Sequence, residues 1–490
     1  MRSRGFGFRA GRESAPGSVG RGMGGFGRGR GRGWQPSKQA EARPPSPPLG
    51  IALQEIKPQH LAQDGVASGL PKITGCNYVA SFNWVDSSEP KIIVPGMPPV
   101  WDPFDEPTQL KEDSGDYFRD RNAARFPDHP IEPAVRALFA QTPDFSTQDI
   151  DVFACGSTLG NLLRFVRNED RAFRFVVEAV GNTVFFIRRE NAPDEKIPDV
   201  RGYGHTFPEK YTRWSDDVAG SVSHQRMIQY TFGAKKFIIR SESDGYLPDK
   251  VEGQKSPSGI ALETSAKAGH LTVAKGGPSG IALEVPAEAG HLNMAKGGQT
   301  IPQGAIFDLK TRSVKRVGDD VLSEQIQRFW VNQTPNFILA FHDRGLFEDI
   351  RVQNVRPDIE NWERENEKQL RQLSTLVNKI ITCVRGSPDG RCEIRRSATP
   401  GSSLELRYVG GSAPSALPRD LSKRWAGNED DRDTSSDEDA DVGGAHVDSD
   451  GYVDSGDERY VAGLSDDDDD AKDYTACSAE DCGYCGRCKY

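Results

Sequence analysis

The sequence predicts an α+β domain, with mixed β-sheets flanked by helices, between two polar tails. Short β-rich apolar runs alternate with helical patterns from about residue 77 to about residue 410. Before this region the chain is rich in Gly, Arg and Pro, and after about residue 427 it is dominated by Asp and Glu. The predicted organisation is a disordered RG- and Pro-rich tail at 1–70, a globular domain at 71–411, an acidic disordered linker at 412–472 and a Cys-rich end at 473–490.

The elements of the predicted domain follow from local patterns. The run FRFVVEAVGNTVFFIRRE predicts a hairpin, because Gly181-Asn182 separates two β-rich segments. Leu370, Leu373, Leu376 and Ile380 recur at helical spacing, so residues 360–384 are predicted as one long amphipathic helix. The other predicted elements are helices at 131–141, 157–167 and 323–334 and strands at 235–247, 304–313 and 336–342.

Composition sets limits on the class of protein. Hydrophobic residues make up 36% of the 490 residues, and the formal net charge is −10. The sequence has no run of 18 apolar residues, so we expect no membrane span, and the Arg-containing N-terminus has no apolar core of the kind a secretory signal needs. Eight cysteines, four of them in the last fourteen positions, favour a reducing compartment over a disulfide scaffold.

An internal duplication interrupts the domain. PSGIALETSAKAGHLTVAKGG at 257–277 is followed by PSGIALEVPAEAGHLNMAKGG at 278–298. Two copies are too few for a solenoid, so we interpret residues 249–300 as an inserted surface excursion between two strands. His270 and His291 recur because the unit does, and we assign them no metal.

Four charged side chains on two predicted strands indicate a candidate metal-binding catalytic site. Alternate residues of a strand share a face, so Glu242 and Asp244 are expected to point together, as are Asp308 and Lys310. If the two strands are neighbours, three carboxylates and one ammonium converge, and such a cluster needs a cation. Oxygen ligands suit Mg²⁺ or Mn²⁺, which support attack of water on a phosphodiester. The plainer interpretation is two exposed strand ends with ordinary salt bridges.

Together these motifs resemble a known pattern. Glu-x-Asp on one strand and Asp-x-Lys on another resemble the core of the PD-(D/E)XK nucleases. From about residue 148 to 345, the segments FPEKY, SESDGY, FDLKTRS and RFWVNQTPNFILAFH are similar, in the same order, to motifs of the DXO family of decapping exonucleases. The resemblance therefore implies a nuclease-like fold of this kind.

The resemblance also implies roles for individual residues. Glu209, Asp244 and Asp308 would be metal ligands together with the carbonyl of Leu309. Glu242 would hold metal-bound water or complete the shell. Lys310 would orient the attacking water, and Gln333 would stand near the water or the scissile phosphate.

The sequence departs from the family pattern at the start of one helix. The family has Arg-Gly there, and the arginine contacts RNA, whereas this chain has Cys155-Gly156. Arg164 or Arg167 is a candidate replacement. The substitution bears on substrate preference more than on metal binding.

The implied function is metal-dependent hydrolysis at RNA 5′ ends, by decapping or pyrophosphohydrolysis and by 5′→3′ degradation. A 5′→3′ exoribonuclease is the implied protein partner, and the nucleus, or else the cytoplasm, the implied location. The main alternative is a non-catalytic member that binds RNA or an exoribonuclease, and a DNA nuclease on the same scaffold is a third possibility.

The two ends of the chain carry further predictions. The RG repeats suit contact with phosphates and stacking on bases, or form a solubilising tail without a partner. Cys477, Cys482, Cys485 and Cys488 are spaced closely enough to hold a tetrahedral Zn²⁺; a free thiol tail and an iron–sulfur cluster are the alternatives. The Asp runs are interpreted as solvated tail, because no apolar face accompanies them.

Overall fold

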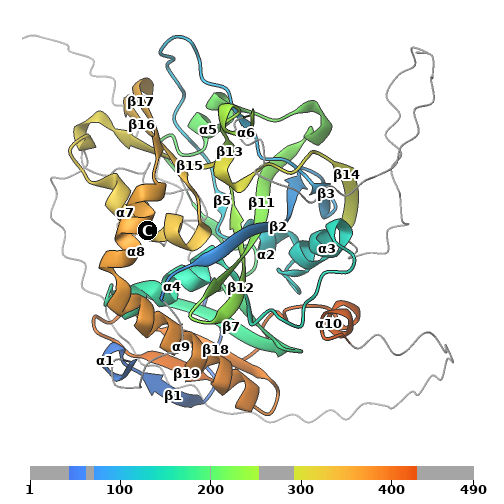
Figure 1. Ribbon diagram of the computed structural model, residues 1–490. Coiled ribbons are helices and arrows are strands. Elements are labelled where there is room, and N and C mark those ends of the chain that lie inside the picture. The colour runs from blue at the N-terminus through green and yellow to red at the C-terminus, as the bar shows by residue number, and fades with distance from the viewer. Residues whose placement is uncertain (1–43, 62–70, 199, 253–291, 428–490) are drawn as a thin grey trace, which may run out of the picture. The chain divides into compact units, whose positions relative to one another are not determined.

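Two β-sheets form the centre of the part of the chain that the computed structural model describes, residues 44–61, 71–198, 200–252 and 292–427 (Figure 1). The larger sheet has eleven strands and the smaller sheet six, and both mix parallel with antiparallel pairs. The predicted α+β class with mixed sheets flanked by helices is confirmed. The tails at 1–43 and 428–490, the four C-terminal cysteines and most of the duplicated segment lie outside the described residues.

The strands of the larger sheet come from the whole length of the described chain. In spatial order they are β1 (Ala52–Ile56), β19 (Leu404–Arg407), β18 (Arg391–Arg396), β7 (Phe173–Val180), β8 (Thr183–Arg188), β6 (Val152–Cys155), β12 (Lys235–Glu242), β11 (Ser221–Phe232), β2 (Thr74–Val85), β3 (Lys91–Pro95) and β14 (Asn293–Gly297). The predicted hairpin is β7 and β8, which pair antiparallel around Gly181 with its positive φ.

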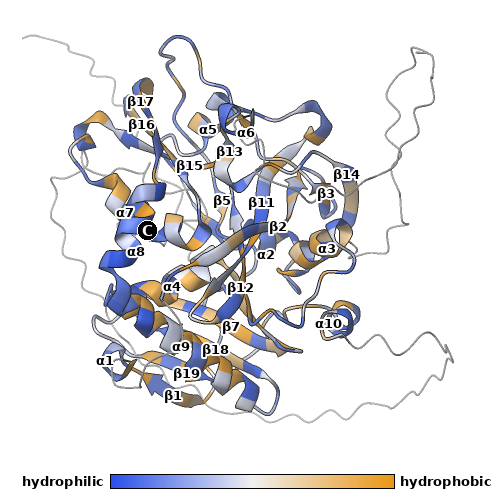
Figure 2. Cartoon of the chain, in the orientation of Figure 1, coloured by the Kyte–Doolittle hydropathy of each residue, from blue (hydrophilic) through white to orange (hydrophobic). Residues whose placement is uncertain are grey.

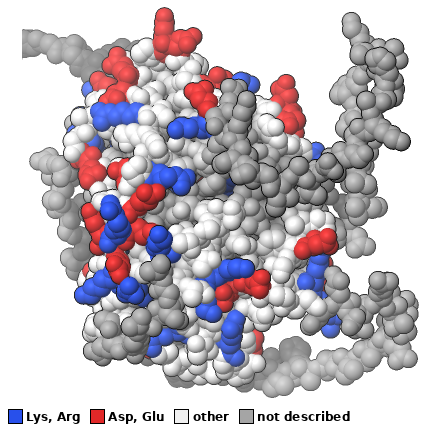
Figure 3. Space-filling view, viewed as in Figure 1, with Lys and Arg blue, Asp and Glu red and all other residues white. Residues whose placement is uncertain are grey.

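Helices cover both faces of the larger sheet. In β12, Phe237 and Ile239 join a core with α4 (Gly156–Val166), α7 (Val321–Asn332) and α9 (Glu367–Gly386), while Ile238 faces α3 (Glu132–Gln141) and α10 (Arg419–Trp425). Such alternation is expected for a strand buried on both faces. Figure 2 shows the apolar residues on these strands and helices, whereas α8 (Arg356–Glu365) is mostly hydrophilic. On the face drawn in Figure 3, acidic and basic side chains are intermingled and gather most densely around α8.

The smaller sheet carries the second acidic motif. Its order is β10 (Thr212–Arg213), β4 (Val100–Trp101), β13 (Gly245–Tyr246), β15 (Ile306–Ser313), β16 (Asn336–Asp343) and β17 (Leu346–Asn354). Phe307 and Leu309 of β15 pack on Phe207 of α5 (Thr206–Tyr211), so Asp308 and Lys310 point to the opposite face, toward α7. The remaining described elements are α1 (Pro58–Leu61), α2 (Arg121–Arg125), α6 (Asp249–Glu252) and the two-stranded pair of β5 (Tyr117–Phe118) and β9 (Lys196–Ile197).

The chain is anchored just before residue 253 and just after residue 291. Val251 of α6 packs against a small core that contains Ile301 and Ala305. On the other side, β14 pairs in parallel with β3 at the edge of the larger sheet. Both ends of the excursion are therefore held by the folded domain.

Two predicted elements are each divided in the structure. The strand predicted at 235–247 is β12 followed by β13, and the two belong to different sheets. The long helix predicted at 360–384 is α8 followed by α9, because the backbone leaves helical geometry at Asn366, with φ −104° and ψ 19°. The predicted core stripe is nevertheless correct, since Leu370, Leu373 and Leu376 are fully buried.

The folded part extends beyond the predicted domain boundaries of 71 and 411. On the N-terminal side, β1 pairs antiparallel with β19 in the larger sheet. On the C-terminal side, Trp425 of α10 is buried against Phe139, Phe153 and Phe185. Composition alone placed both segments in tails, because the sequence around each is rich in Pro and polar residues, and long-range packing is what orders them. Within the described residues, no helix has the length and apolar character needed to cross a membrane.

Replacing Trp425 by Ala is expected to lower the free energy of unfolding by about 3–5 kcal/mol, because the ring fills a core site and its Nε1 donates to Thr183 Oγ1 at 2.9 Å. Urea unfolding of the full chain measures the change. The control is Lys423→Ala on the exposed side of α10, which should change the stability by less than about 0.5 kcal/mol. Equal effects of the two substitutions would contradict the role of α10 in the core.

Candidate active site

The candidate site lies where the chain passes from the larger sheet to the smaller one. Glu242 is the last residue of β12, Asp244 lies in the connection, and Gly245 begins β13. Gly245 pairs with Phe307 of β15, and a Cβ at this position would stand 2.4 Å from the Phe307 ring and 2.8 Å from the Pro99 carbonyl oxygen. Only glycine therefore permits this close crossing of the two strands.

The Asp244 carboxylate joins the two acidic motifs directly. Its Oδ2 accepts a hydrogen bond of 2.7 Å from the backbone N–H of Leu309, between Asp308 and Lys310. The predicted strands 235–247 and 304–313 are neighbours, as expected. Only the β13 part of the first strand pairs with β15, however, because β12 belongs to the larger sheet.

Three of the predicted acids line one cavity of about 140 Å³. They are Glu209 on α5, Glu242 and Asp244, and the wall also includes Arg121 and His205. Glu242 accepts from Gln225 Nε2 at 3.0 Å, and its other oxygen lies 3.8 Å from an Arg121 nitrogen. The structure thus brings these three carboxylates to a common space, which we call the acidic cavity.

Helix α5 is held in place by a carboxylate distant in sequence. Asp113 accepts from the backbone N–H groups of His205 and Thr206 at 2.9 and 2.7 Å, and also from the Thr206 hydroxyl. These bonds satisfy N–H groups at the start of the helix that have no partner within it. Asp113 therefore positions the helix that carries Glu209.

Asp308 and Lys310 are more deeply buried than the other predicted site residues, each about 3% exposed. The Asp308 carboxylate forms an ion pair of 2.8 Å with Arg328 of α7. Lys310 lies close enough to His205 for its ammonium charge to act on that imidazole. Neither Asp308 nor Lys310 is among the residues that line the acidic cavity.

The donor set suits a hard divalent cation, but the side chains do not form a coordination shell. In the described part of the chain, no group of three or more His, Cys, Asp or Glu side chains is placed to hold a metal ion. Two arginines stand beside the predicted acids instead, Arg328 on Asp308 and Arg121 near Glu242. Opposite charge at these distances offsets the mutual repulsion of the carboxylates.

A second cavity, of about 80 Å³, adjoins the first through Glu242, which lines both. Its wall includes Cys155, Gly156 and Ser157 at the N-terminus of α4. Four arginines contribute to the same wall, Arg164, Arg188, Arg240 and Arg328. A helix N-terminus among guanidinium groups favours anions, so we call this space the α4 cavity.

The two arginines considered as replacements at the family's arginine position differ in placement. Arg164 lines the α4 cavity, whereas Arg167 lies over the Trp362 ring and forms an ion pair of 2.9 Å with Glu169. Gln333 is absent from the lining of both cavities, and its side-chain amide donates to the Trp330 carbonyl at 2.6 Å. Its neighbour Asn332 lines the α4 cavity, and a buried Oδ1 of this residue has no hydrogen-bond partner.

Burial and neighbouring charges fix the protonation of two groups in the site. Burial acts to raise the pKa of Asp120, but Arg188, Arg240 and backbone N–H groups lower it below its ordinary value. Burial lowers the pKa of His205 to about 4; Asp113 opposes this shift, while Arg121 and Lys310 reinforce it. His205, whose ring stacks on Tyr117, is therefore a neutral imidazole at pH 7.

Sequence reasoning missed Asp113, Arg121, His205 and Arg328. Asp113, Arg121 and His205 lie outside the segments that resemble family motifs, and Arg328 lies inside one of them but was given no role. All four reach the site through tertiary contacts. The one available signal for Arg328 was its position on the predicted helix at 323–334, next to the strand that carries Phe337.

The described fold is thus an α+β domain in which two mixed sheets meet at an acidic cavity beside an arginine-lined one. The chain belongs to the family described as domain of unknown function (DUF8563), whose model matches residues 59–425. No curated protein sequence matches the chain.

Several solved structures resemble the fold at low sequence identity. Rai1 of Scheffersomyces stipitis, in complex with (3′-NADP)⁺ and calcium, is 11% identical with a TM-score of 0.48, covering 78% of this chain and 99% of that one. Candida albicans Rai1 with pU5-Mn²⁺ is 11% identical with a TM-score of 0.42, covering 76% and 98%. Dxo1 of K. lactis with manganese is 8% identical with a TM-score of 0.38, covering 76% and 98%. These are proteins of the DXO family that the motif order resembles, and at such scores the function has to be inferred from this chain's own residues.

The pKa of His205 predicts a pH dependence of stability. Because the folded-state pKa of about 4 lies below the ordinary 6.5, the unfolded chain binds the proton more readily. The contribution of this group is fully present above pH 6.5 and declines as the pH falls toward 4, by at most about 1.4 kcal/mol per pH unit. The difference in unfolding free energy between wild type and His205→Gln, measured at pH 7 and pH 5, should therefore shift in favour of the variant at pH 5. A difference that does not vary with pH would show that His205 titrates normally in the folded protein.

Proposed function

We propose that this protein is a divalent-metal-dependent hydrolase that acts on RNA 5′ ends. The observation that carries the proposal is the hydrogen bond from Leu309 N–H to Asp244, which brings Glu-x-Asp and Asp-x-Lys together beside an arginine-lined cavity. The motif resemblance to the DXO family agrees with this assignment.

Glu209, Asp244 and Asp308 are the side chains proposed to hold the ion, with the carbonyl of Leu309. The N–H and C=O of one strand residue point to the same edge, so the Leu309 carbonyl faces the edge where Asp244 lies. Asp308 must leave Arg328 to take part. When bound, Mg²⁺ or Mn²⁺ would supply Lewis acidity at the phosphoryl group and a more acidic water.

The protein's own groups have separate proposed tasks. The N-terminus of α4 and Arg164, Arg188 and Arg240 would hold the 5′ phosphate groups in the α4 cavity. Glu242, which lines both cavities, would accept a hydrogen bond from the attacking water. Lys310, a buried ammonium, would stabilise the charge that builds on the phosphoryl oxygens. The Gln333 amide donates to the Trp330 carbonyl and lines neither cavity, whereas its neighbour Asn332 is one of the amide side chains that line the α4 cavity.

A non-catalytic RNA-binding protein is the second candidate, and one observation favours it. Arg328 pairs with Asp308 and Arg121 stands near Glu242, so cationic side chains already offset the charge of two predicted acids. A 5′→3′ exoribonuclease partner and a nuclear location are proposed on the family resemblance alone.

Hydrolysis is tested with the full chain on RNAs that carry a 5′ triphosphate, a cap or a 5′ monophosphate, with Mn²⁺ or Mg²⁺ and with EDTA. We expect metal-dependent cleavage of at least one substrate, reduced about 100-fold or more by Asp308→Asn, which removes a proposed metal ligand, or by Lys310→Met, which removes the ammonium that stabilises the phosphoryl oxygens. Asp349→Asn, an equivalent change at the surface of β17, is the control and should leave the rate unchanged. Absence of metal-dependent cleavage by wild type would refute the enzyme assignment.

Metal binding is tested separately by titrating Mn²⁺ calorimetrically. Because Arg328 competes for Asp308, Arg328→Gln is expected to tighten Mn²⁺ binding about tenfold, while Asp308→Asn weakens it. If wild type and Arg328→Gln both bind no Mn²⁺ but bind RNA in EDTA, the non-catalytic candidate holds.

A further inference from the structure

A third cavity, of about 300 Å³, lies on the other side of α4 and is strongly basic. Of the described residues in its wall, seven are arginines and one, Glu190, is acidic. The arginines are Arg119, Arg171, Arg174, Arg188, Arg189, Arg395 and Arg396. We call this space the arginine cavity.

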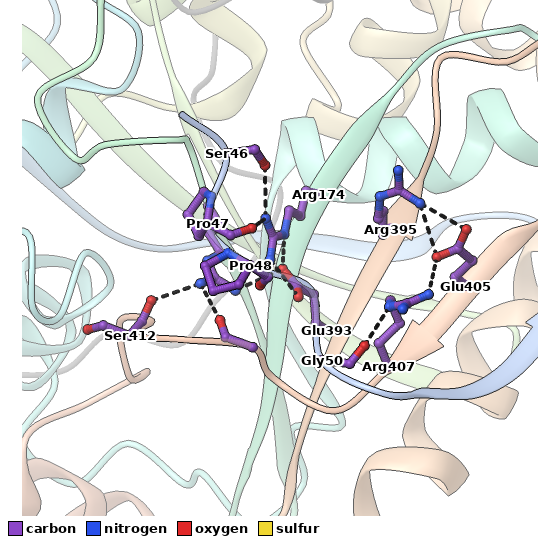
Figure 4. Close-up of polar contacts among 12 residues, drawn as sticks. Ser46, Pro47, Pro48, Gly50, Arg174, Glu393, Arg395, Glu405, Arg407 and Ser412 are labelled. Atoms are coloured by element: carbon purple, nitrogen blue, oxygen red, sulfur yellow. Dashed lines mark hydrogen bonds and ion pairs between the residues drawn. The ribbon is translucent and has the colours of Figure 1, made fainter. Parts of the chain in front are cut away.

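Carboxylates around the arginine cavity are shared between guanidinium groups. Glu393, which is fully buried, accepts from both Arg174 and Arg189 (Figure 4). Glu405 likewise pairs with both Arg395, at 2.9 Å, and Arg407, at 2.6 Å. Other arginines of the wall have carboxylate partners of their own: Arg119 pairs with Glu195, Arg188 with Asp120 and Glu190, and Arg396 with Asp170. The local excess of positive charge therefore lies at the two shared pairs, on Glu393 and Glu405, and in a partly buried site such an excess attracts anions.

The rest of the wall is suited to phosphate oxygens rather than to apolar ligands. Thr158, Asn161 and Asn191 add hydroxyl and amide groups to the guanidiniums. Arg174 also donates to Ser46 Oγ and to the carbonyl oxygens of Pro47 and Pro48, which fastens the segment around Ser46 at the rim (Figure 4). Planar guanidiniums bind phosphate with paired hydrogen bonds, so the wall matches an anion with several oxygens.

The arginine cavity is connected to the candidate active site. Arg188 lines both this cavity and the α4 cavity. Helix α4 also contributes to both, with Ser157, Gly160 and Arg164 on one side and Thr158 and Asn161 on the other. A strand whose 5′ phosphate occupies the α4 cavity therefore meets the arginine cavity next.

We propose that the arginine cavity binds backbone phosphates of the RNA chain that follows the 5′ end. The proposal rests on the proposed function for its ligand, since it extends the same strand from the α4 cavity. Such binding makes the affinity of the protein for RNA depend on the length of the RNA as well as on its 5′ group. The contacts are to phosphates, so no base preference is expected from them.

The test measures equilibrium binding of 5′-monophosphorylated, fluorescently labelled oligouridylates of about three and about twelve nucleotides, in EDTA so that no cleavage occurs. Arg395→Gln removes one guanidinium of the wall but leaves Glu405 paired with Arg407. We expect this variant to weaken binding of the longer RNA about tenfold and to reduce its log–log salt slope by about 0.7. Binding of the short RNA should change less than twofold.

Arg407→Gln is the matched control, because Arg407 pairs with the same Glu405 but does not line the cavity (Figure 4). Arg407→Gln should behave as wild type, and thermal melting of both variants verifies folding. Equal loss for Arg407→Gln and Arg395→Gln, or loss of affinity for both RNA lengths alike, would overturn the proposal. The proposal would also be overturned if the arginine cavity bound inorganic tripolyphosphate while the affinity for RNA did not increase with the length of the RNA. The binding measurement is made in EDTA and does not depend on catalysis. If the separate hydrolysis assay showed no cleavage, the proposed activity would be refuted, but the outcome of this binding test would stand.

Discussion

The hydrogen bond from the Leu309 N–H to Asp244 is the constraint on which the arrangement of the candidate site depends. It fixes β15 of the smaller sheet against the connection that follows β12, and it does so where Gly245 allows the two backbones to approach closely. Through this contact, residues more than sixty positions apart in sequence share one small volume. The remaining groups of the site are placed relative to it: Glu209 by the Asp113 bonds to α5, and Lys310 by its alternation with Leu309 along β15.

Charge in this region is arranged as a gradient between two cavity walls. Carboxylates dominate on the side of α5 and β13, and guanidiniums dominate around α4. Glu242 and the Arg328–Asp308 pair lie at the boundary. A buried ion pair is costly to break but contributes little net stability compared with apolar packing, so this pair is better understood as a competitor for Asp308 than as a stabilising element. A cation bound at Asp308, as proposed, would have to displace the Arg328 guanidinium.

Local patterns in the sequence were sufficient for the class of fold and for most element positions. The hairpin around Gly181, the strand that carries Asp308 and the buried stripe of Leu370, Leu373 and Leu376 all follow from periodicity and turn chemistry. The break after Glu242 could not be predicted, because both halves favour extended backbone and only pairing partners distinguish them. Trp425 was missed for a related reason, since one aromatic residue in a polar stretch gives no pattern. Motif spacing proposed the acids of the site but could not reveal Arg121 or Arg328, whose roles arise from tertiary contacts.

The anchoring of the chain at Val251 and at β14 has a consequence for how this gene can change. The cost of closing a loop rises by only about 0.6 kcal/mol when its length doubles. The second copy of the repeat ends with β14, so a further copy inserted before residue 278 leaves β14 and the pairing of β15 with β13 unchanged. Insertion of a copy at this position is therefore nearly neutral for the folded domain, and the number of copies can change without altering either sheet.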